Sequence, residues 1–246
     1  MLQSIKIISV ALLCLATACV SKKEYNAAVE KKNEYYARMQ NLISDSVALA
    51  TKSDRLAGAL GEEMVENNMK ERQLRMLRER LIEQNGQINQ LNKTLANALV
   101  DFNAEELTVS LKEGKVYVSL SDQLLFSSGS ATINGKGKQA LAELSEVLND
   151  NPDIRINVEG HTDIVPVVGG LYKDNWDLSL SRAATVVRAL VEDYGVSPNK
   201  VTASGKSKYD PLVKNTTDEM KQKNRRIEII LSPDLGELYE MLSYKK

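Results

Sequence analysis

Histidine and cysteine are scarce in this chain of 246 residues, which contains one histidine and two cysteines. A zinc site takes three or four ligands from histidine, cysteine and carboxylate side chains. The single histidine, His161, has Glu159 and Asp163 two residues away on either side, and no other segment of the sequence supplies the remaining ligands. The sequence therefore predicts no metal site.

Charge of one sign is also lacking, because 32 basic and 33 acidic residues leave a net charge of −1. Proteins that bind nucleic acid neutralise many phosphates with lysine and arginine. The composition therefore predicts no nucleic-acid partner. The GxSxG signature of a hydrolase nucleophile is absent as well, and we expect neither an enzymatic activity nor a cofactor.

A hydrophobic run long enough to span a membrane, which takes roughly 20 residues, is missing from the N-terminus. The apolar run over residues 7–15 follows Lys6 and precedes small residues, as in a secretory signal peptide. Leu15-Ala16-Thr17-Ala18-Cys19 resembles a bacterial lipobox, so we expect residues 1–18 to be removed and Cys19 to be lipidated. The alternative is ordinary cleavage near Ala18 without lipid.

The cysteine count agrees with a lipoprotein. Cys14 would leave with the signal peptide, and a lipidated Cys19 leaves no thiol for a disulfide. Each buried methylene of the lipid contributes about 0.8 kcal/mol to membrane binding. Val20 stands where, by resemblance to proteobacterial lipoproteins, an aspartate would favour the inner membrane. We predict an outer-membrane lipoprotein whose following domain faces the periplasm.

Proline is missing between residues 21 and 103, and this stretch is rich in helix-forming residues. Its second half has a seam of mostly apolar residues at alternating spacings of three and four, namely Leu74, Leu77, Leu81, Gln84, Ile88, Leu91, Leu95, Ala98 and Phe102. This heptad pattern extends over about four repeats and predicts a coiled coil. Residues 19–104 should form a helical tether, and the coiled coil makes a homo-oligomer the expected assembly.

The heptad pattern fails upstream at Asn67 and Lys70, just after Gly58 and Gly61, so we expect a break or bend there. Roughly 80 helical residues could reach on the order of 120 Å if straight. The alternative to an oligomeric coiled coil is a helical hairpin that buries the seam within one chain.

The segment over residues 105–233 alternates short strands with helices. Period-two patterns predict strands near residues 116–120, 154–159, 200–204 and 226–231, with helices at 141–148 and 178–194. Gly195 should cap the second helix. Four strands and two helices form a compact α/β unit, and residues 234–246 are expected to form a C-terminal helix.

His161 has two candidate roles besides metal binding. A Ser–His–acid arrangement would need a nucleophile at an elbow or helix start, for which the sequence has no signature. The role we expect is structural, with the ring partly buried and its nitrogens bound to backbone groups that fix the turn.

Asp163 ends the second predicted strand, Asn175 is well placed to cap the next helix, and Arg182 lies inside that helix. If the helix packs beside the strand, the carboxylate and the guanidinium converge. They would then form a salt bridge with each other, or hold a zwitterion, with Asp163 binding an ammonium and Arg182 a carboxylate. The spacing leaves both possibilities open.

Three motifs occur in order and with fitting spacing: GHTD at 160–163, NWDLSLSRA at 175–183 and NRRIEI at 224–229. Over about residues 107–232 the chain resembles the OmpA-like peptidoglycan-binding domain of OmpA, Pal and MotB proteins. The resemblance implies an α+β fold with a mixed four-stranded sheet packed by helices. It also implies peptidoglycan as the partner, bound at the stem peptide, usually at diaminopimelate.

By this resemblance Asp163 and Arg182 hold the zwitterionic end of diaminopimelate. The positions that match supporting contacts of the family are Thr162, Asn175, the backbone near Gly129, Asn224 and Arg225. The implied function is that of an outer-membrane lipoprotein that binds peptidoglycan non-covalently and tethers the envelope layers.

Two alternatives remain, an envelope assembly factor for secretion or motility and a MotB-like stator subunit. A stator needs a membrane helix with a functional acidic residue. The apolar run over residues 7–15 contains no Asp or Glu and leads into the lipobox, which disfavours the stator.

Overall fold

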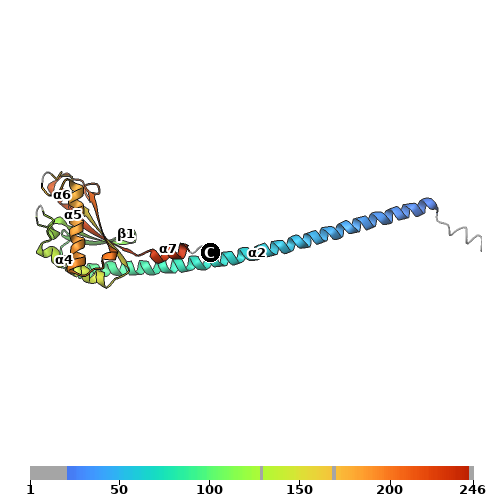
Figure 1. Ribbon diagram of the computed structural model, residues 1–246, viewed down its shortest axis with the longest axis horizontal. Helices are drawn as coiled ribbons and strands as arrows, with labels where there is room; N and C mark the ends of the chain where they lie inside the picture. Colours follow the sequence, from blue (N-terminus) through green and yellow to red (C-terminus); the bar gives the residue numbers. More distant parts are fainter. Residues whose placement is uncertain (1–20, 128–129, 168–169, 244–246) are drawn as a thin grey trace, which may run out of the picture. The chain divides into compact units, whose positions relative to one another are not determined.

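The computed structural model describes residues 21–127, 130–167 and 170–243 (Figure 1). The chain divides into two compact units, residues 1–72 and 73–246. The predictions for the signal peptide, for Cys19 and for Gly129 fall outside the described residues. None of the helices in the described ranges combines the length and the apolar character that crossing a bilayer requires.

Helix α2 (Lys22–Ala98) begins with a reciprocal cap. The backbone N–H of Glu24 donates to Ser21 Oγ at 3.2 Å, and the backbone N–H of Ser21 donates to Glu24 Oε2 at 3.3 Å. The helix continues through Gly58 and Gly61 without the break that we expected. Each glycine costs only about 1 kcal/mol in a helix, and the flanking residues are strong helix formers. Because one uninterrupted helix holds the whole segment, the hairpin alternative is wrong.

Residues 21–72, the described part of the first unit, are exposed along their whole length. Their large apolar side chains include Met39, Leu42, Leu49, Leu56 and Leu60, with exposed fractions between 49% and 67%. This part of α2 therefore has an apolar seam without a packing partner in the described chain.

The end of α2, in the second unit, behaves differently. Its seam residues Ile88, Leu91 and Leu95, followed by Leu99, are at most 3% exposed and belong to the hydrophobic core of the unit. The compact unit thus begins at Gln73, upstream of the boundary near residue 105 that the composition indicates. Ile88, Leu91 and Leu95 of the predicted coiled-coil seam are thus buried within the chain itself, whereas Ala98 is exposed and Leu99 is buried in its place.

The second unit contains a five-stranded sheet of order β1-β2-β5-β3-β4. The strands are β1 (Leu107–Lys112), β2 (Lys115–Ser121), β3 (Ile154–His161), β4 (Val201–Ser207) and β5 (Arg226–Pro233). β3 and β4 are parallel and the other neighbours are antiparallel. The α+β fold with a mixed sheet is confirmed.

The strand count was wrong by one, because the sequence analysis missed β1. Its residues LTVSLK are joined to β2 by a tight turn in which Glu113 and Gly114 have φ angles of 50° and 71°. Positive φ at both central positions suits the right-handed twist of a two-residue hairpin. β1 lies at the edge of the sheet and buries only Leu107, so its apolar alternation is weak.

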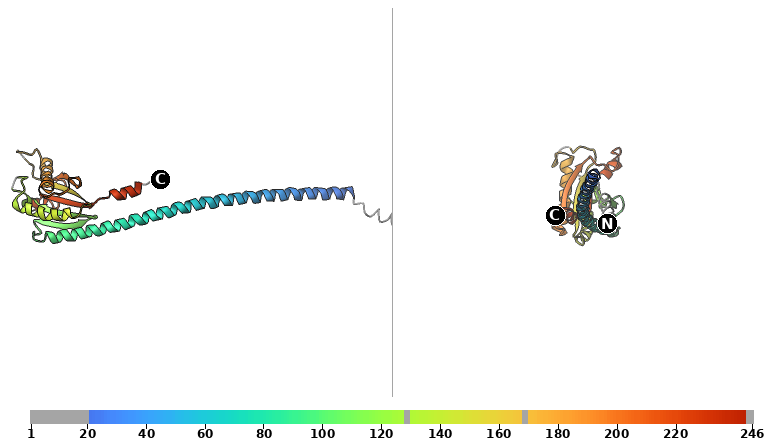
Figure 2. Two further views of the ribbon diagram at one scale, coloured as in Figure 1. Left: turned by 60° about the horizontal axis from the view of Figure 1, so that its bottom comes forward. Right: turned by 90° about the vertical axis from the view of Figure 1, so that its right-hand side faces the viewer.

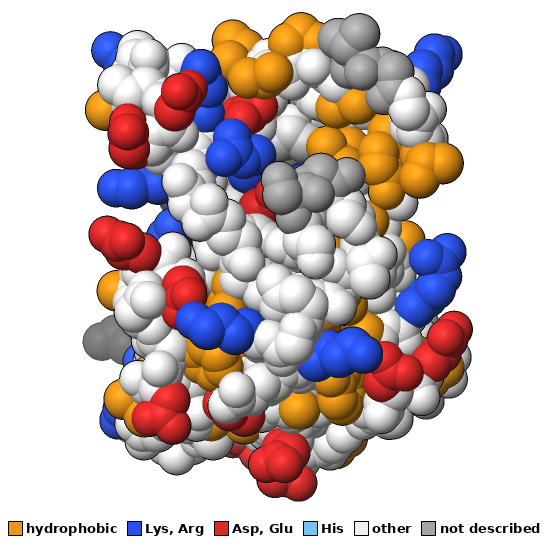
Figure 3. All heavy atoms as spheres, turned by 90° about the vertical axis from the view of Figure 1, so that its left-hand side faces the viewer, with side chains coloured by type: hydrophobic (Ala, Val, Ile, Leu, Met, Phe, Trp, Pro, Cys, Tyr) orange, Lys and Arg blue, Asp and Glu red, His pale blue; other side chains and the backbone are white. Residues whose placement is uncertain are grey.

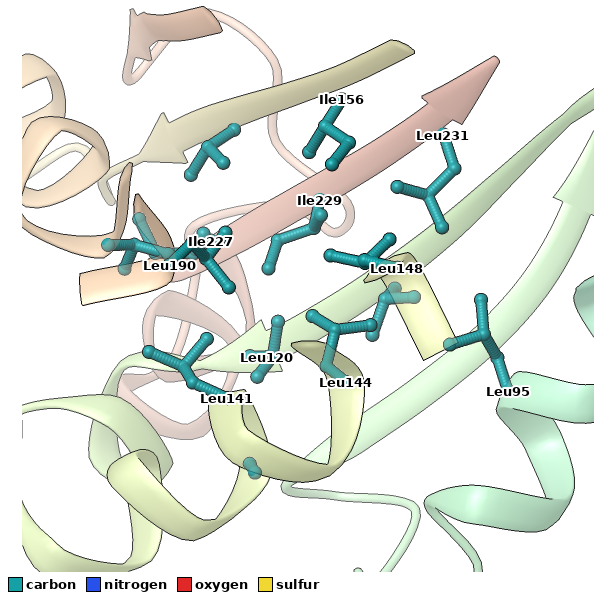
Figure 4. Close-up of a cluster of buried hydrophobic side chains, with 14 of the residues drawn as sticks. Leu95, Leu120, Leu141, Leu144, Leu148, Ile156, Leu190, Ile227, Ile229 and Leu231 are labelled. Carbon is teal, nitrogen blue, oxygen red and sulfur yellow. The ribbon is translucent and has the colours of Figure 1, made fainter. Parts of the chain in front are cut away.

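One face of the sheet is covered by helices α4 (Gly135–Asn149), α5 (Asn175–Arg188) and the end of α2 (Figure 2). Figure 4 shows Leu144 and Leu148 of α4 beside Leu95 of α2, packed toward the strand residues Ile229 and Leu231. The opposite face carries mostly polar side chains from alternate positions of the strands, with Ile230 as an apolar exception. The sheet therefore has a helix-covered face and an outer polar face.

Gly160 of β3 sets the position of α5. A Cβ at residue 160 would lie 2.1 Å from the backbone oxygen of Ser179, so only glycine allows this approach. The close contact brings the start of α5 against the end of β3, where the GHTD motif lies.

Several short elements complete the unit: α3 (Asp122–Leu125), η1 (Ala189–Asp193), η2 (Pro198–Lys200), α6 (Asp218–Asn224) and α7 (Gly236–Ser243). The helix predicted over residues 178–194 is α5 followed by the π-helical turn η1, and Gly195 follows it with a φ of 71°. Contacts between Gln73 Nε2 and the Met241 oxygen, and between Gln84 Nε2 and the Asp234 oxygen, join α7 and the segment before it to α2.

Candidate ligand-binding site

The start of α5 differs from the expectation by one residue. Asp174 is the cap, since its Oδ1 accepts from the backbone N–H groups of Trp176 and Asp177 at 2.8 and 3.0 Å. Asn175 is the first helical residue and does not cap the helix. An aspartate at this position serves as well as an asparagine, so the two neighbours could not be distinguished from the sequence.

Asn175 instead connects α5 to the loop that follows β3. Its Nδ2 donates to the backbone oxygens of Asp163 at 3.3 Å and Val165 at 3.1 Å. Asn175 is 7% exposed, and its Oδ1 has no hydrogen-bond partner within the described residues. The side chain therefore fixes the loop and leaves one buried acceptor beside Asp163.

Asp163 is 5% exposed and lies just beyond the end of β3. Its Oδ1 accepts from the backbone N–H of Val165 at 2.9 Å, and its Oδ2 forms an ion pair with Arg225 Nη1 at 2.5 Å. Of the two possibilities that the spacing left open, the direct salt bridge between Asp163 and Arg182 does not form, because Asp163 pairs with Arg225, whose side chain is 33% exposed.

Arg182 of α5 has its own carboxylate partner, Asp122 at the start of α3. The two guanidinium nitrogens Nη1 and Nη2 lie 2.8 and 3.1 Å from the two Asp122 oxygens, and Nη2 also donates to the Ser130 backbone oxygen at 3.3 Å. The guanidinium lies over the Phe126 ring, 5.2 Å from its centroid. Nε of Arg182 is buried and makes no hydrogen bond in the described part of the chain.

The two ion pairs form one cluster, which we call the paired-charge cluster: Asp122, Asp163, Arg182 and Arg225. Burial raises the pKa of the Asp122 carboxyl, Arg182 and Arg225 oppose this rise, and Asp163 adds to it. The charges of the second ion pair, Asp163 and Arg225, thus act on a member of the first, so the two pairs interact electrostatically. Two carboxylates and two guanidinium groups therefore balance in a largely buried site.

Asp122 is the member of this cluster that the sequence analysis missed. It follows Ser121, whose Oγ accepts from the backbone N–H of Leu124 at 3.2 Å and caps α3. An acidic residue in the first turn of a helix is common and stabilising, so Asp122 looks like an ordinary part of a capped helix. Asp122 and Arg182 are 60 positions apart in the sequence, so no local pattern indicates that they pair.

The remaining predicted residues have different surroundings. The Thr162 hydroxyl donates to the Asp163 backbone oxygen at 3.1 Å, and its backbone N–H donates to the Ser207 oxygen at 2.9 Å. Asn224, fully buried, bonds both backbone groups of Val213 and the side chain of Asn215. Thr162 and Asn224 thus hold the loops around the site, and a direct contact with a ligand stays a prediction for each.

The structural role expected for His161 was wrong in its detail. Neither ring nitrogen makes a hydrogen bond within the described residues, to backbone or otherwise, and the residue is 2% exposed. Strand alternation turns the ring to the outer polar face of the sheet, where Nε2 lies 3.3 Å from Glu159 Oε1 and 3.8 Å from Glu228 Oε2. Burial, aided by Arg226, lowers the pKa of His161 to about 4.

Charges of both signs are interspersed on the face of the molecule that Figure 3 shows, and hydrophobic side chains gather there in separate groups. This distribution agrees with the balanced composition.

Comparison with known proteins identifies relatives of the domain. Residues 125–225 match the model of the OmpA family. Motility protein B of Bacillus subtilis is 31% identical over 128 residues, which are 52% of this chain and 49% of that protein. The probable lipoprotein YiaD of Escherichia coli is 32% identical over 127 residues, 52% of this chain and 56% of that protein. The chain spans about half the length of the curated relatives it matches.

Among solved structures, the cell wall anchor of the T6SS from Pseudomonas aeruginosa matches with a TM-score of 0.52 and 29% identity, covering 57% of this chain and 97% of that chain. The names of these three relatives describe no catalytic activity, in agreement with the expectation that the chain is not an enzyme.

Proposed function

Because the chain carries a domain of the OmpA family, we propose that it is an envelope protein whose domain binds peptidoglycan non-covalently, at the zwitterionic end of diaminopimelate in the stem peptide. The solved relative that is a cell wall anchor supports this partner. The observation that carries the proposal is the paired-charge cluster, in which Asp163 and Arg182 each have a separate partner of opposite charge.

A zwitterion can enter this cluster by exchanging ion-pair partners. The ligand ammonium replaces Arg225 as the partner of Asp163. The ligand carboxylate binds the Arg182 guanidinium, which then contacts both this group and Asp122. Breaking a buried pair is costly when one buried charge stays alone. The exchange keeps Asp163 and Arg182 paired, and only the displaced Arg225 turns to solvent. Arg225 is the member best able to move, because its side chain is 33% exposed while those of Asp163 and Arg182 are 7% and 6% exposed.

Two unpartnered polar atoms beside the cluster fit the same ligand. Arg182 Nε is a free donor for a carboxylate, and Asn175 Oδ1 is a free acceptor for an ammonium, both within the described residues. Buried polar groups normally have partners. A zwitterionic ligand carries both of the groups that these two atoms could bind. Contacts from Thr162 and from the backbone near Gly129 remain part of the proposal by family resemblance.

A surface groove of about 580 Å³ adjoins the cluster through Ser130, whose backbone oxygen accepts from Arg182. Other residues of its wall are Lys138, Tyr172, Arg188 and Glu192. The groove offers space and charged side chains for the rest of the stem peptide.

Sedimentation with isolated peptidoglycan tests the proposal. We expect Asp163→Asn and Arg182→Gln each to weaken binding at least about 30-fold, since truncating one partner of a buried charge contact costs about 2 kcal/mol or more. Asp218→Asn is the matched control, because that carboxylate is 93% exposed and lies outside the cluster. Unchanged sedimentation of both cluster variants would refute the zwitterion site.

The membrane anchor is a separate proposal that rests on the lipobox. Cys19 is the lipidated residue, and the chain resides in the outer membrane with its domain in the periplasm; the likeness to a probable lipoprotein supports this. Cells fed a labelled fatty acid should label the wild-type chain and not Cys19→Ser. Equal labelling of the two chains would refute lipidation at Cys19.

The exposed part of α2 serves in this proposal as a spacer that associates with a second copy of the chain. Its seam of large apolar side chains, which are 49% to 67% exposed, supports a coiled coil over residues 21–72. Leu42→Glu together with Leu49→Glu should shift the chain to a lower mass in sedimentation equilibrium, whereas Glu34→Lys should not.

A second candidate function is anchoring a motility or secretion machine to the cell wall. The likenesses to motility protein B and to the T6SS cell wall anchor favour it. Crosslinking in cells distinguishes the candidates, because a machine component would be recovered with fixed partner proteins and a simple tether would not.

A further inference from the structure

The outer polar face of the sheet carries a second group of charged residues near the ends of β3 and β5. Glu159 of β3 lies directly opposite Glu228 of β5, and His161 lies opposite Arg226. Side chains of directly opposed residues project to the same face of a sheet. All four residues are at most 8% exposed, so two carboxylates and a histidine are buried together.

The histidine in this group lacks hydrogen bonds. Its Nδ1 and Nε2 have no hydrogen-bond partner within the described residues, although Nε2 approaches the Glu159 and Glu228 carboxylates to 3.3 and 3.8 Å. A buried polar atom without a partner costs about 1–3 kcal/mol. The ring is therefore held toward two carboxylates without the bonds that would stabilise it there.

A third carboxylate comes from the loop between β4 and α6. Asp210 is exposed, and one potential metal-binding atom from each of Glu159, His161 and Asp210 lies within 4.8 Å of the other two. Metal–ligand bonds of about 2 Å put neighbouring zinc ligands roughly 3.3 Å apart. The three ligand atoms must therefore move closer together to bind zinc. Because Asp210 lies on an exposed loop, a small movement of this residue would bring its carboxylate within reach.

We propose that Glu159, His161 and Asp210 form a binding site for a divalent transition metal of the Zn²⁺ class, with Glu228 beside it. Imidazole favours zinc and similar ions, whereas a site made of oxygen atoms alone would favour Mg²⁺ or Ca²⁺. Three protein ligands leave a fourth position for water or for Glu228 Oε2. The sequence alone does not reveal these ligands, because Asp210 and Glu228 are brought to His161 only by the fold.

The two basic side chains near this site, Arg226 and Lys206, do not prevent a cation from binding. Arg226 Nε binds Glu228 Oε1 at 2.8 Å, and its Nη1 donates to the Asp210 backbone oxygen at 3.2 Å, so the guanidinium is already engaged. Lys206 Nζ is 4.0 Å from Glu159 Oε2 on a side chain that is 48% exposed, and it can turn to solvent. Neither nitrogen of the His161 ring has a hydrogen-bond partner in the described part of the chain, so the neutral ring offers the metal a lone pair.

The metal site does not rest on the proposed wall binding. None of its three ligands belongs to the paired-charge cluster. Asp210→Asn should therefore sediment with peptidoglycan like the wild-type chain while binding zinc more weakly. Failure of wall binding in all variants would leave the metal measurement unaffected.

The test uses the full chain without a polyhistidine tag, stripped with a chelator and titrated with ZnCl2. His161 is the only histidine of the chain, so the single ¹³Cε1–¹H signal of a histidine-labelled sample reports on this ring. We expect the signal to shift and saturate at one equivalent of Zn²⁺, with no shift from equal CaCl2 or MgCl2. A signal that stays in place while zinc binds elsewhere would overturn the proposal.

Calorimetric titration of two exposed variants completes the test and avoids disturbing the core. Asp210→Asn should weaken zinc binding at least about 10-fold, and Asp150→Asn, an exposed carboxylate at the end of α4, should bind like the wild-type chain. Equal affinity of Asp210→Asn and wild type would exclude Asp210 as a ligand and overturn the three-ligand site.

Discussion

His161 and Asp163 are two residues apart in the sequence and belong to two charge groups of different character. Asp163 lies in the paired-charge cluster, where two carboxylates face two guanidinium groups and each has a bonded partner. His161 lies on the outer polar face with Glu159, Glu228 and Asp210, where neither ring nitrogen has a hydrogen bond within the described residues. We call this second group the carboxylate–histidine cluster.

The difference shows how burial acts on balanced and unbalanced charges. In the paired-charge cluster, Arg182 and Arg225 oppose the effect of burial on the pKa of Asp122. In the carboxylate–histidine cluster, burial raises the pKa of Glu159, Lys206 opposes the rise and Glu228 adds to it. The first group is suited to a ligand that carries both charges, and the second to a ligand that carries only positive charge.

Among the variants that test this difference, Arg182→Gln should change the free energy of unfolding most. It leaves Asp122 partly buried without a partner, and breaking a buried ion pair costs about 3–5 kcal/mol. We expect the free energy of unfolding, measured by urea denaturation at pH 7, to fall by about 3 kcal/mol. Asp122→Asn combined with Arg182→Gln should recover part of this loss, and a double variant less stable than either single one would contradict the pairing.

Acid should destabilise the chain through His161 by a similar amount. The pKa of His161 is lowered from 6.5 to about 4 by burial. The ring is therefore protonated near pH 6.5 in the unfolded chain but only near pH 4 in the folded chain. The stabilisation is present above pH 6.5 and is lost as the pH falls toward 4. It amounts to about 3 kcal/mol, since one pKa unit corresponds to about 1.4 kcal/mol.

Urea denaturation at pH 7 and pH 4.5 measures this loss, and His161→Gln should show a flatter pH dependence between these values. The histidine NMR signal should titrate near pH 4. A midpoint near 6.5 in the folded chain would contradict the burial effect.

Glu159→Gln should have a smaller effect of opposite sign. With a raised pKa, the Glu159 carboxylate is unfavourable once charged, so its contribution to stability is present below about pH 4.5 and is lost as the pH rises. Removing the charge from the pair with Glu228 should stabilise the metal-free chain by about 0.5 kcal/mol at pH 7. In thermal unfolding, the variant should have the higher melting temperature without ZnCl2, and the wild-type chain should have the higher melting temperature with ZnCl2.

Asp210→Asn should change the stability of the metal-free chain least, within about 0.5 kcal/mol, because Asp210 is exposed and substitutions at the surface usually have small effects. Chemical denaturation measures this. A large loss without metal would mean that Asp210 holds the fold through its own contacts.

Parts of the fold could be predicted because local patterns carry them. Val116, Val118 and Leu120 alternate in the sequence and are fully buried in β2, and Gly195 adopts the left-handed conformation expected of a helix end. β1 was missed because an edge strand buries little. The heptad seam was assigned to one coiled coil because spacing does not tell which surface covers it. Ile88 and Leu95 pack on their own domain, while Leu49 and Leu56 stay exposed.

The candidate site divides in the same way. Asp163, Arg182 and Arg225 were identified by motif, and the structure brings them into one cluster. Asp122 escaped notice because its pairing with Arg182 spans 60 residues, and the cap of α5 was placed one residue late because Asp174 and Asn175 are both good caps.

The amino-acid sequence by itself determined the long helix, the α+β character of the domain and the identity of the GHTD, LSxxRA and NRR motifs, because helix propensity, strand alternation and motif spacing are local properties. Only the tertiary structure decided which charges meet. The close approach at Gly160 sets α5 against the end of β3, and the register of β3 with β5 places Glu228 beside His161. Partners in an ion pair or a metal site are chosen by distance in space, which depends on the packing of the whole domain.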